Sequence, residues 1–75
     1  MGTENLRNKL RELRKTGGGL TQQELAELAG VTRQSIISIE QGRYRPSVEL
    51  ALKLARALGC SVEELFQLAD EEGAS

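Results

Sequence analysis

The chain has 75 residues, the size of one small domain, and a formal net charge of −1. It contains one Pro, one Tyr and one Phe, whereas Leu, Ala, Glu and Arg are abundant, and this composition favours an all-α fold. No signal peptide and no apolar run of about 18 residues is visible, so neither secretion nor a membrane span is indicated, and we expect a cytoplasmic protein.

Charged residues are distributed unevenly along the chain. Residues 1–45 contain eight basic and five acidic residues, a net charge of +3, whereas residues 46–75 contain two basic and six acidic residues, a net charge of −4. One interpretation is a basic side that binds nucleic acid and an acidic far side. The other is an ordinary solvated surface. Charge alone does not separate the two, and the total of −1 argues mildly against nucleic-acid binding.

Leucines at helical spacing predict a first helix over about residues 4–15. Leu6, Leu10 and Leu13 form its apolar stripe. Three consecutive glycines at 17–19 then break the helix and give a flexible connection, and we expect Leu20 to anchor this loop in the core.

Residues 21–42 predict two short helices joined by a tight turn. Thr21 and Glu24 form a capping box, in which each side chain satisfies a backbone N–H group at the start of the first of these helices. Gly30 is placed to end this helix in a left-handed conformation. The apolar face of the helix is expected to comprise Leu25, Leu28 and Ala29.

The second helix of this segment begins after Thr32, the next candidate N-cap, and ends at Gly42. Val31 lies in the turn and is expected to fill the core, and Ile36 and Ile39 form the inward stripe of the helix. The residues left facing outward are Arg33, Gln34, Ile37, Ser38 and Gln41. A helix of about ten residues with a polar, hydrogen-bonding outer face fits the major groove of DNA.

A fourth helix is predicted from Pro46 and Ser47 to Leu58, with Gly59 at its end. Its inward face is expected to comprise Val48, Ala51, Leu52, Ala55 and Leu58.

A second capping box, Ser61 with Glu64, predicts a fifth helix that passes through Leu65 and Phe66 toward Leu68. Residues 70–75 form an acidic tail that is expected to fray. We therefore predict an all-α, compact five-helix bundle over residues 1–69.

Cys60, between the last two helices, is interpreted as core filler rather than a reactive thiol. A single cysteine excludes an internal disulfide, and with no histidine in the chain no metal site is plausible. We expect no cofactor and no small-molecule ligand.

Several motifs follow one another in a fixed order from Leu6 to Phe66. They read Leu-Thr-Gln-x-Glu-Leu-Ala, Ala-Gly-Val-Thr-Arg-Gln-Ser-Ile, Ile-Glu-x-Gly, Pro-Ser, Leu-Ala-x-Ala-Leu-Gly and Ser-x-Glu-Glu-Leu-Phe. This order resembles the lambda-type phage repressor and Cro family, the xenobiotic-response-element type of helix-turn-helix regulator. It is most similar to the short stand-alone members that carry Gly-x-Tyr-x-Pro-Ser. The three glycines at 17–19 depart from the family, which usually has one glycine there.

The resemblance implies a sequence-specific transcriptional regulator, a repressor that binds a near-palindromic operator in double-stranded DNA as a homodimer. The base-facing positions of the family correspond to Thr32, Arg33, Gln34, Ile37 and Ser38. The phosphate-binding positions correspond to Thr21, Gln22, Gln41, Arg43 and Arg45. Arg33 is a candidate for a guanine contact or for a phosphate contact, and Ile37 for a thymine methyl contact or for filling a gap in the core. Tyr44 is assigned a structural role.

The resemblance also implies an ion pair between Arg14 and Glu40, partly buried between the first and third helices. The alternative is two independent surface charges, which contribute only about 0–1 kcal/mol.

A dimer interface is predicted from a surplus of apolar residues, since a core of this size is marginal by itself. These residues are Leu50, Leu54, Phe66 and Leu68. The alternative is that they complete the core of the monomer.

A second function is a module that binds a protein partner, such as an antitoxin, with DNA binding secondary. This interpretation ranks lower because only a short acidic tail follows the fifth helix. An enzyme is not expected, because the sequence has no histidine, no nucleophile motif and no phosphate-binding loop.

Overall fold

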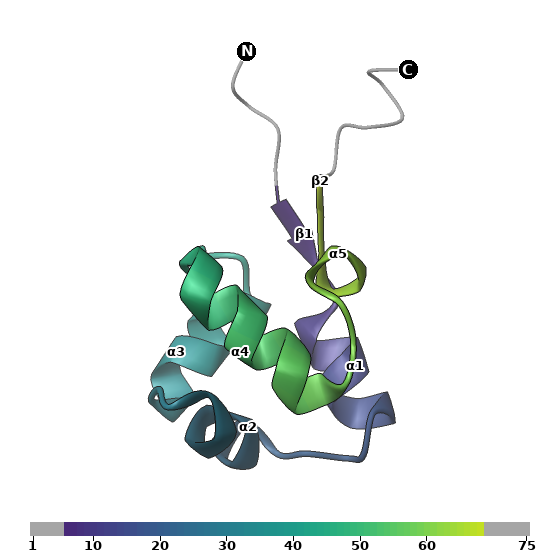
Figure 1. Cartoon of the computed structure of the whole chain (residues 1–75). Helices are drawn as coiled ribbons and strands as arrows, with labels where there is room; N and C mark the ends of the chain where they lie inside the picture. The colour runs from purple at the N-terminus through teal and green to yellow at the C-terminus, as the bar shows by residue number, and fades with distance from the viewer. Residues whose placement is uncertain (1–5, 69–75) are drawn as a thin grey trace.

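The computed structural model describes residues 6–68 and contains five helices and one small sheet (Figure 1). In chain order the elements are β1 (Leu6–Asn8), α1 (Leu10–Thr16), α2 (Gln22–Ala29), α3 (Arg33–Glu40), α4 (Val48–Leu58), α5 (Val62–Leu65) and β2 (Phe66–Leu68). The predicted five-helix fold class is confirmed, and the sheet is an addition to it. The acidic tail predicted at 70–75 lies outside the described residues.

The two ends of the described chain pair as an antiparallel sheet beside the helices (Figure 1). Leu6 pairs with Leu68, and Asn8 pairs with Phe66. The prediction that the first helix includes Leu6 and that the fifth helix extends past Leu65 is therefore wrong at these positions. Asn8 explains the late start of α1, because its side-chain Oδ1 accepts a hydrogen bond from the Leu10 N–H at 3.2 Å and holds the backbone outside the helix.

Helix caps form where the sequence predicts them. Thr21, Thr32, Ser47 and Ser61 each accept a hydrogen bond from the backbone N–H three residues later. The boxes at Thr21 and Ser61 are reciprocal, since the glutamate in each accepts from the N–H of the cap residue. Each such cap stabilises the protein by about 0.5–2 kcal/mol relative to alanine.

The core draws large side chains from every helix. The fully buried ones are Leu10, Leu25, Ile36, Ile39, Leu54 and Leu65. Burial of each stabilises the fold by about 1.5–3 kcal/mol. Val31, Leu20 and Cys60 are partly buried against this core, as expected.

The apolar faces of α2 and α4 differ from the prediction. Leu28 is 60% exposed, and Ala26 is buried in its place. On α4, Val48 and Leu52 are exposed, whereas Leu50 and Leu54 are buried. The reason is that α4 has apolar residues on more than one face, and its packing against α2 and α5 selects the face that turns inward. Leu50 and Leu54 therefore belong to the core and are not available as a dimer surface.

The helices of the described region, residues 6–68, include none with both the length and the apolar character that crossing a membrane requires.

The orientation of α4 predicts unequal effects of two leucine substitutions. Leu54→Ala should destabilise the protein by about 2–5 kcal/mol, because it leaves a cavity in the core. Leu52→Ala, on the exposed face of the same helix, should change the free energy of unfolding by no more than about 0.5 kcal/mol. Urea unfolding followed by circular dichroism measures both values. Equal losses in the two variants would contradict this orientation of α4.

Candidate nucleic-acid interface

The turn between α2 and α3 fixes the angle of the two helices. Gly30 adopts φ 74°, a left-handed conformation that a residue with a side chain rarely adopts. The Val31 N–H then donates to the Ala26 carbonyl at 2.9 Å, and its side chain packs against the core. Thr32 begins α3 by accepting from the Ser35 N–H at 3.1 Å. These local bonds place α3 directly after α2 and pack it against that helix.

One side of α3 is buried and the other side is accessible. Ile36 and Ile39 are buried, which confirms the predicted inward stripe. Of the predicted base-facing residues, Thr32, Arg33 and Gln34 are exposed, and Gln41, a predicted phosphate ligand directly after the helix, is exposed as well. The remaining predicted base-facing residues of the helix, Ile37 and Ser38, are half-buried. The helix therefore presents a mixed polar and apolar surface to solvent.

Two open hollows flank the accessible side of α3. The larger, of about 870 Å³, is lined by Arg33, Ile37 and Glu40 of α3 and by Gln41 directly after it, and across from them by α1 and the start of α2. The smaller, of about 240 Å³, is lined by Thr32, Gln34, Ser35, Ser38 and Tyr44. The five predicted base-facing residues thus divide into two strips, Arg33 with Ile37 on one side and Thr32 with Gln34 and Ser38 on the other.

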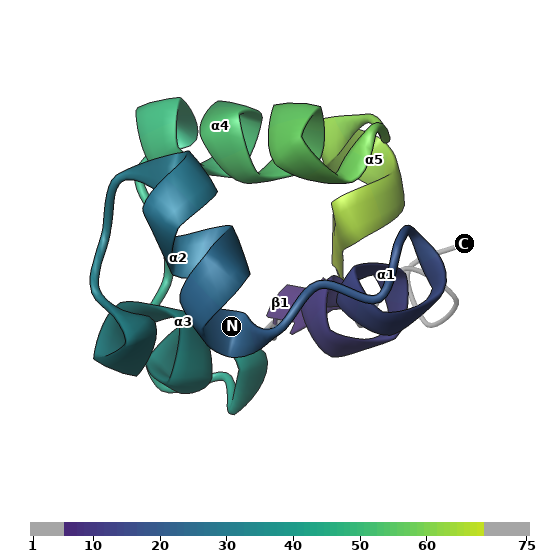
Figure 2. The same cartoon turned by 90° about the horizontal axis from the view of Figure 1, so that it is seen from below.

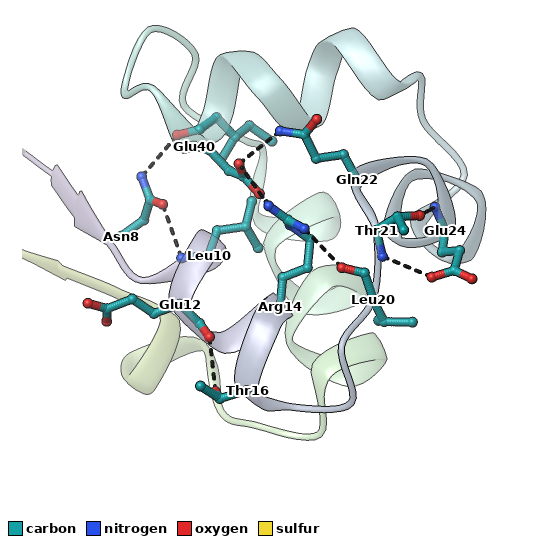
Figure 3. Close-up of polar contacts among 11 residues, drawn as sticks. Asn8, Leu10, Glu12, Arg14, Thr16, Leu20, Thr21, Gln22, Glu24 and Glu40 are labelled. Atoms are coloured by element: carbon teal, nitrogen blue, oxygen red, sulfur yellow. Dashed lines mark hydrogen bonds and ion pairs between the residues drawn. The ribbon is translucent and has the colours of Figure 1, made fainter.

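Arg14 and Glu40 form the ion pair that the sequence predicted (Figure 3). Arg14 Nε donates to Glu40 Oε2 at 2.8 Å, and the two side chains are 10% and 6% exposed. A second nitrogen, Nη2, donates to Oε1 at 3.5 Å, and Nη1 donates to the Leu20 carbonyl at 2.9 Å. The pair joins α1 to the last residue of α3, and the same guanidinium holds the loop that precedes α2.

Gln22 contributes to the same network. Its amide Nε2 donates to Glu40 Oε1 at 3.1 Å (Figure 3). The sequence predicted a side-chain donor for phosphate here, but this contact already engages one of the two amide N–H groups. Gln22 therefore joins the start of α2 to the end of α3, and its phosphate contact remains a prediction.

Asn8 is a positioning residue that the sequence did not reveal. Its Nδ2 donates to the carbonyl of Ile39 at 3.0 Å, in the last turn of α3 (Figure 3). An Asn just before a helix is a known local signal for capping. Its partner on α3 is distant in the chain and had no signal in the sequence. The sheet at the chain ends is thereby connected to α3.

The other predicted phosphate-binding residues lie at the ends of α2 and α3. Thr21 is exposed at the start of α2, where its hydroxyl and N–H are engaged in the capping box. Gln41, Arg43 and Arg45 are exposed after α3. The Arg43 N–H donates to the Ser38 carbonyl at 2.9 Å, which keeps this loop beside α3.

Cys60 is partly buried against the core, as predicted for a filler residue. Burial raises the pKa of its thiol, and the negative charge of Glu64 raises it further. The thiolate, which is the nucleophile, is therefore disfavoured at neutral pH.

The family of the chain follows from comparison with known proteins. A family model described as helix-turn-helix matches residues 10–65. The chain therefore belongs to the Cro/C1-type helix-turn-helix family, as its motifs suggested, and it is a DNA-binding transcriptional regulator.

Individual relatives agree with this assignment. An uncharacterized HTH-type transcriptional regulator of Methanothermobacter thermautotrophicus is 57% identical over 70 residues, covering 92% of this chain and 99% of the relative. The uncharacterized HTH-type transcriptional regulator YgzD of Bacillus subtilis is 44% identical over 66 residues, covering 88% of this chain and 98% of the relative. Among solved structures, the restriction-modification controller protein C.AhdI from Aeromonas hydrophila is 43% identical with a TM-score of 0.71, covering 77% of this chain and 86% of that one.

The Arg14–Glu40 pair predicts a measurable coupling. Arg14→Ala should destabilise the protein by about 3–5 kcal/mol, because it leaves the Glu40 carboxylate buried without its partner. Arg7→Ala, at an exposed position, should cost no more than about 0.5 kcal/mol. A double-mutant cycle with Glu40→Gln, measured by urea unfolding, gives the interaction energy. Additive effects of the two substitutions would show that the pair does not stabilise the fold.

Proposed function

We propose that this protein is a sequence-specific repressor that binds a near-palindromic operator as a homodimer, with α3 in the major groove. The observation that carries the proposal is the accessible side of α3. It exposes hydrogen-bonding side chains along the helix while Ile36 and Ile39 hold the opposite side in the core. A helix with this surface has the dimensions and the donors that base recognition in the major groove requires.

The two strips of α3 have different chemistry. Gln34 Nε2 donates to Ser38 Oγ at 3.4 Å, one helical turn away, so the amide lies along the exposed surface of the helix. In this position Gln34 is suited to a bidentate contact with adenine. On the other strip, Arg33 is suited to guanine and the half-buried Ile37 to a thymine methyl group.

Arg43 and Arg45, in the loop after α3, supply phosphate contacts that position the protein without reading sequence. Both side chains are exposed, and the backbone bond from Arg43 to Ser38 keeps the loop next to the strip that contains Gln34 and Ser38. Gln41, together with Thr21 and Gln22 at the start of α2, supplies further contacts to DNA phosphates.

A dimer interface is proposed at the sheet and its surroundings. With Leu50 and Leu54 in the core, Phe66 and Leu68 are the remaining members of the predicted set. Leu68 is 50% exposed and pairs with Leu6, and Phe66 is half-buried against the core. A two-fold dimer through this surface supplies two recognition helices, which a near-palindromic site requires at a spacing of about 34 Å.

A second candidate is a module that binds a protein partner, with DNA binding secondary. The observation that favours it is the apolar surface of α4, where Val48 is 77% and Leu52 is 55% exposed. The discriminating result is a tight complex with one protein together with weak DNA binding.

Titration of two variants separates base reading from phosphate binding. Gln34→Ala should weaken binding to a selected operator by about 1–3 kcal/mol and leave random DNA nearly unaffected, because it removes a base contact. Arg43→Ala should weaken both DNAs and reduce the slope of log K against log salt by about one unit. Fluorescence anisotropy on both duplexes at several salt concentrations measures these effects. Equal weakening of both DNAs by Gln34→Ala would place α3 outside the groove.

The proposed interface predicts the oligomeric state. The protein should sediment as a dimer at micromolar concentration, and Leu68→Glu should shift it to a monomer, because the charge would be buried in the interface. Leu52→Glu is the matched control, an exposed leucine of similar accessibility on α4, and should leave the dimer intact. A monomeric wild-type protein at hundreds of micromolar would contradict the dimer.

A further inference from the structure

The larger hollow beside α3 contains two basic side chains that base reading by α3 does not use. Arg11 and Lys15 are exposed on α1 and line this hollow together with Arg33 and Ile37 of α3. Their spacing of four residues places them one turn apart on the same face of α1. This face of α1 and the accessible side of α3 therefore lie on opposite walls of the same hollow.

The charge of this hollow is strongly positive. Its lining includes Arg11, Lys15, Arg33 and Arg14, and the acidic member is Glu40. Glu40 is only 6% exposed and is already bound by Arg14 and Gln22. Within residues 6–68 the ion pairs are Arg14–Glu40 and Lys53–Glu49, so Arg11 and Lys15 have no acidic partner in this region.

Two like charges one turn apart repel each other and destabilise a helix, and a bound anion removes this cost. A helix in the major groove has one phosphate backbone on each side. On one side of α3, Tyr44 lines the smaller hollow, and its chain neighbours Arg43 and Arg45 are the proposed phosphate ligands. On the other side, the exposed cations of α1 are Arg11 and Lys15.

We propose that Arg11 and Lys15 bind phosphates of the DNA strand that borders the groove on the α1 side of α3. This inference rests on the proposed function and extends it to a contact from the first helix. Arg14, between these two residues in the chain, fixes α1 to the end of α3 through Glu40. The ion pair therefore also sets the position of both cations relative to the bases that α3 reads.

The test compares the salt dependence of DNA binding by the full chain and its variants. Arg11→Gln and Lys15→Gln should each reduce the slope of log K against log salt by about one unit, and the double variant by about two. The selected operator and random DNA should be weakened alike, because phosphates carry no sequence information. Lys15→Arg should retain the wild-type slope, since it keeps the charge.

Arg56→Gln is the matched control. Arg56 is exposed on α4, which lies on the opposite side of the molecule from α1 and α3 (Figure 2). This variant should bind DNA with the wild-type slope. Circular dichroism should show all variants folded, because the substituted side chains are exposed.

The outcomes separate this inference from the proposed function. If the wild-type protein binds DNA and Arg43→Ala lowers the slope, but Arg11→Gln and Lys15→Gln do not, the α1 contact is wrong and the regulator assignment stands. If the wild-type protein fails to bind the operator, both proposals fail. A free phosphorylated molecule is the other source of the same chemistry. Saturable binding of inorganic phosphate at constant ionic strength, seen by NMR and lost in the double variant while the DNA slope is unchanged, would overturn the DNA contact.

Discussion

The buried ion pair between Arg14 and Glu40 is the constraint on which the placement of α3 depends. Its two side chains are nearly excluded from solvent, so each charge requires the other. Through Leu20 and Gln22 the same pair holds the loop before α2 and the first residue of α2. One network therefore relates α1, α2 and α3, and these are the elements that surround the larger hollow.

The C-terminal end of α3 is held by contacts from several elements, whereas the outer surface of the helix is accessible. Glu40 is bound by α1 and α2, and the carbonyl of Ile39 accepts from Asn8 of the terminal sheet. A side chain that reads bases needs a supporting structure that fixes its position to within about 0.5 Å. These polar contacts hold the C-terminal end of α3. The exposed residues Arg33 and Gln34 lie at its N-terminal end.

The hydrogen bond from Asn8 to the Ile39 carbonyl means that the terminal sheet, besides pairing the two ends of the described chain, also helps to hold α3 in place. A two-stranded sheet is marginally stable by itself. Here its strand β1 contacts α3, and its strand β2 carries Leu68, the most exposed residue of the proposed dimer surface. The proposed dimer interface at the sheet would therefore lie one hydrogen bond away from α3, and the proposed pairing of two chains would use the same sheet that holds α3.

The sequence by itself determined the features that depend on near neighbours, and only the tertiary structure decided those that depend on distant ones. The caps at Thr21, Thr32, Ser47 and Ser61 are bonds across three residues, so their spacing is visible in the chain. The family resemblance of the motifs, rather than local spacing, implied the Arg14–Glu40 pair, whose members are 26 residues apart, and marked α3 as the proposed recognition helix. The pairing of Leu6 with Leu68, the bond from Asn8 to α3 and the contact of Gln22 with Glu40 join distant positions. In the sequence, α4 has apolar residues on more than one face, so the spacing did not show which face turns inward. Packing against α2 and α5 selected the face that buries Leu50 and Leu54.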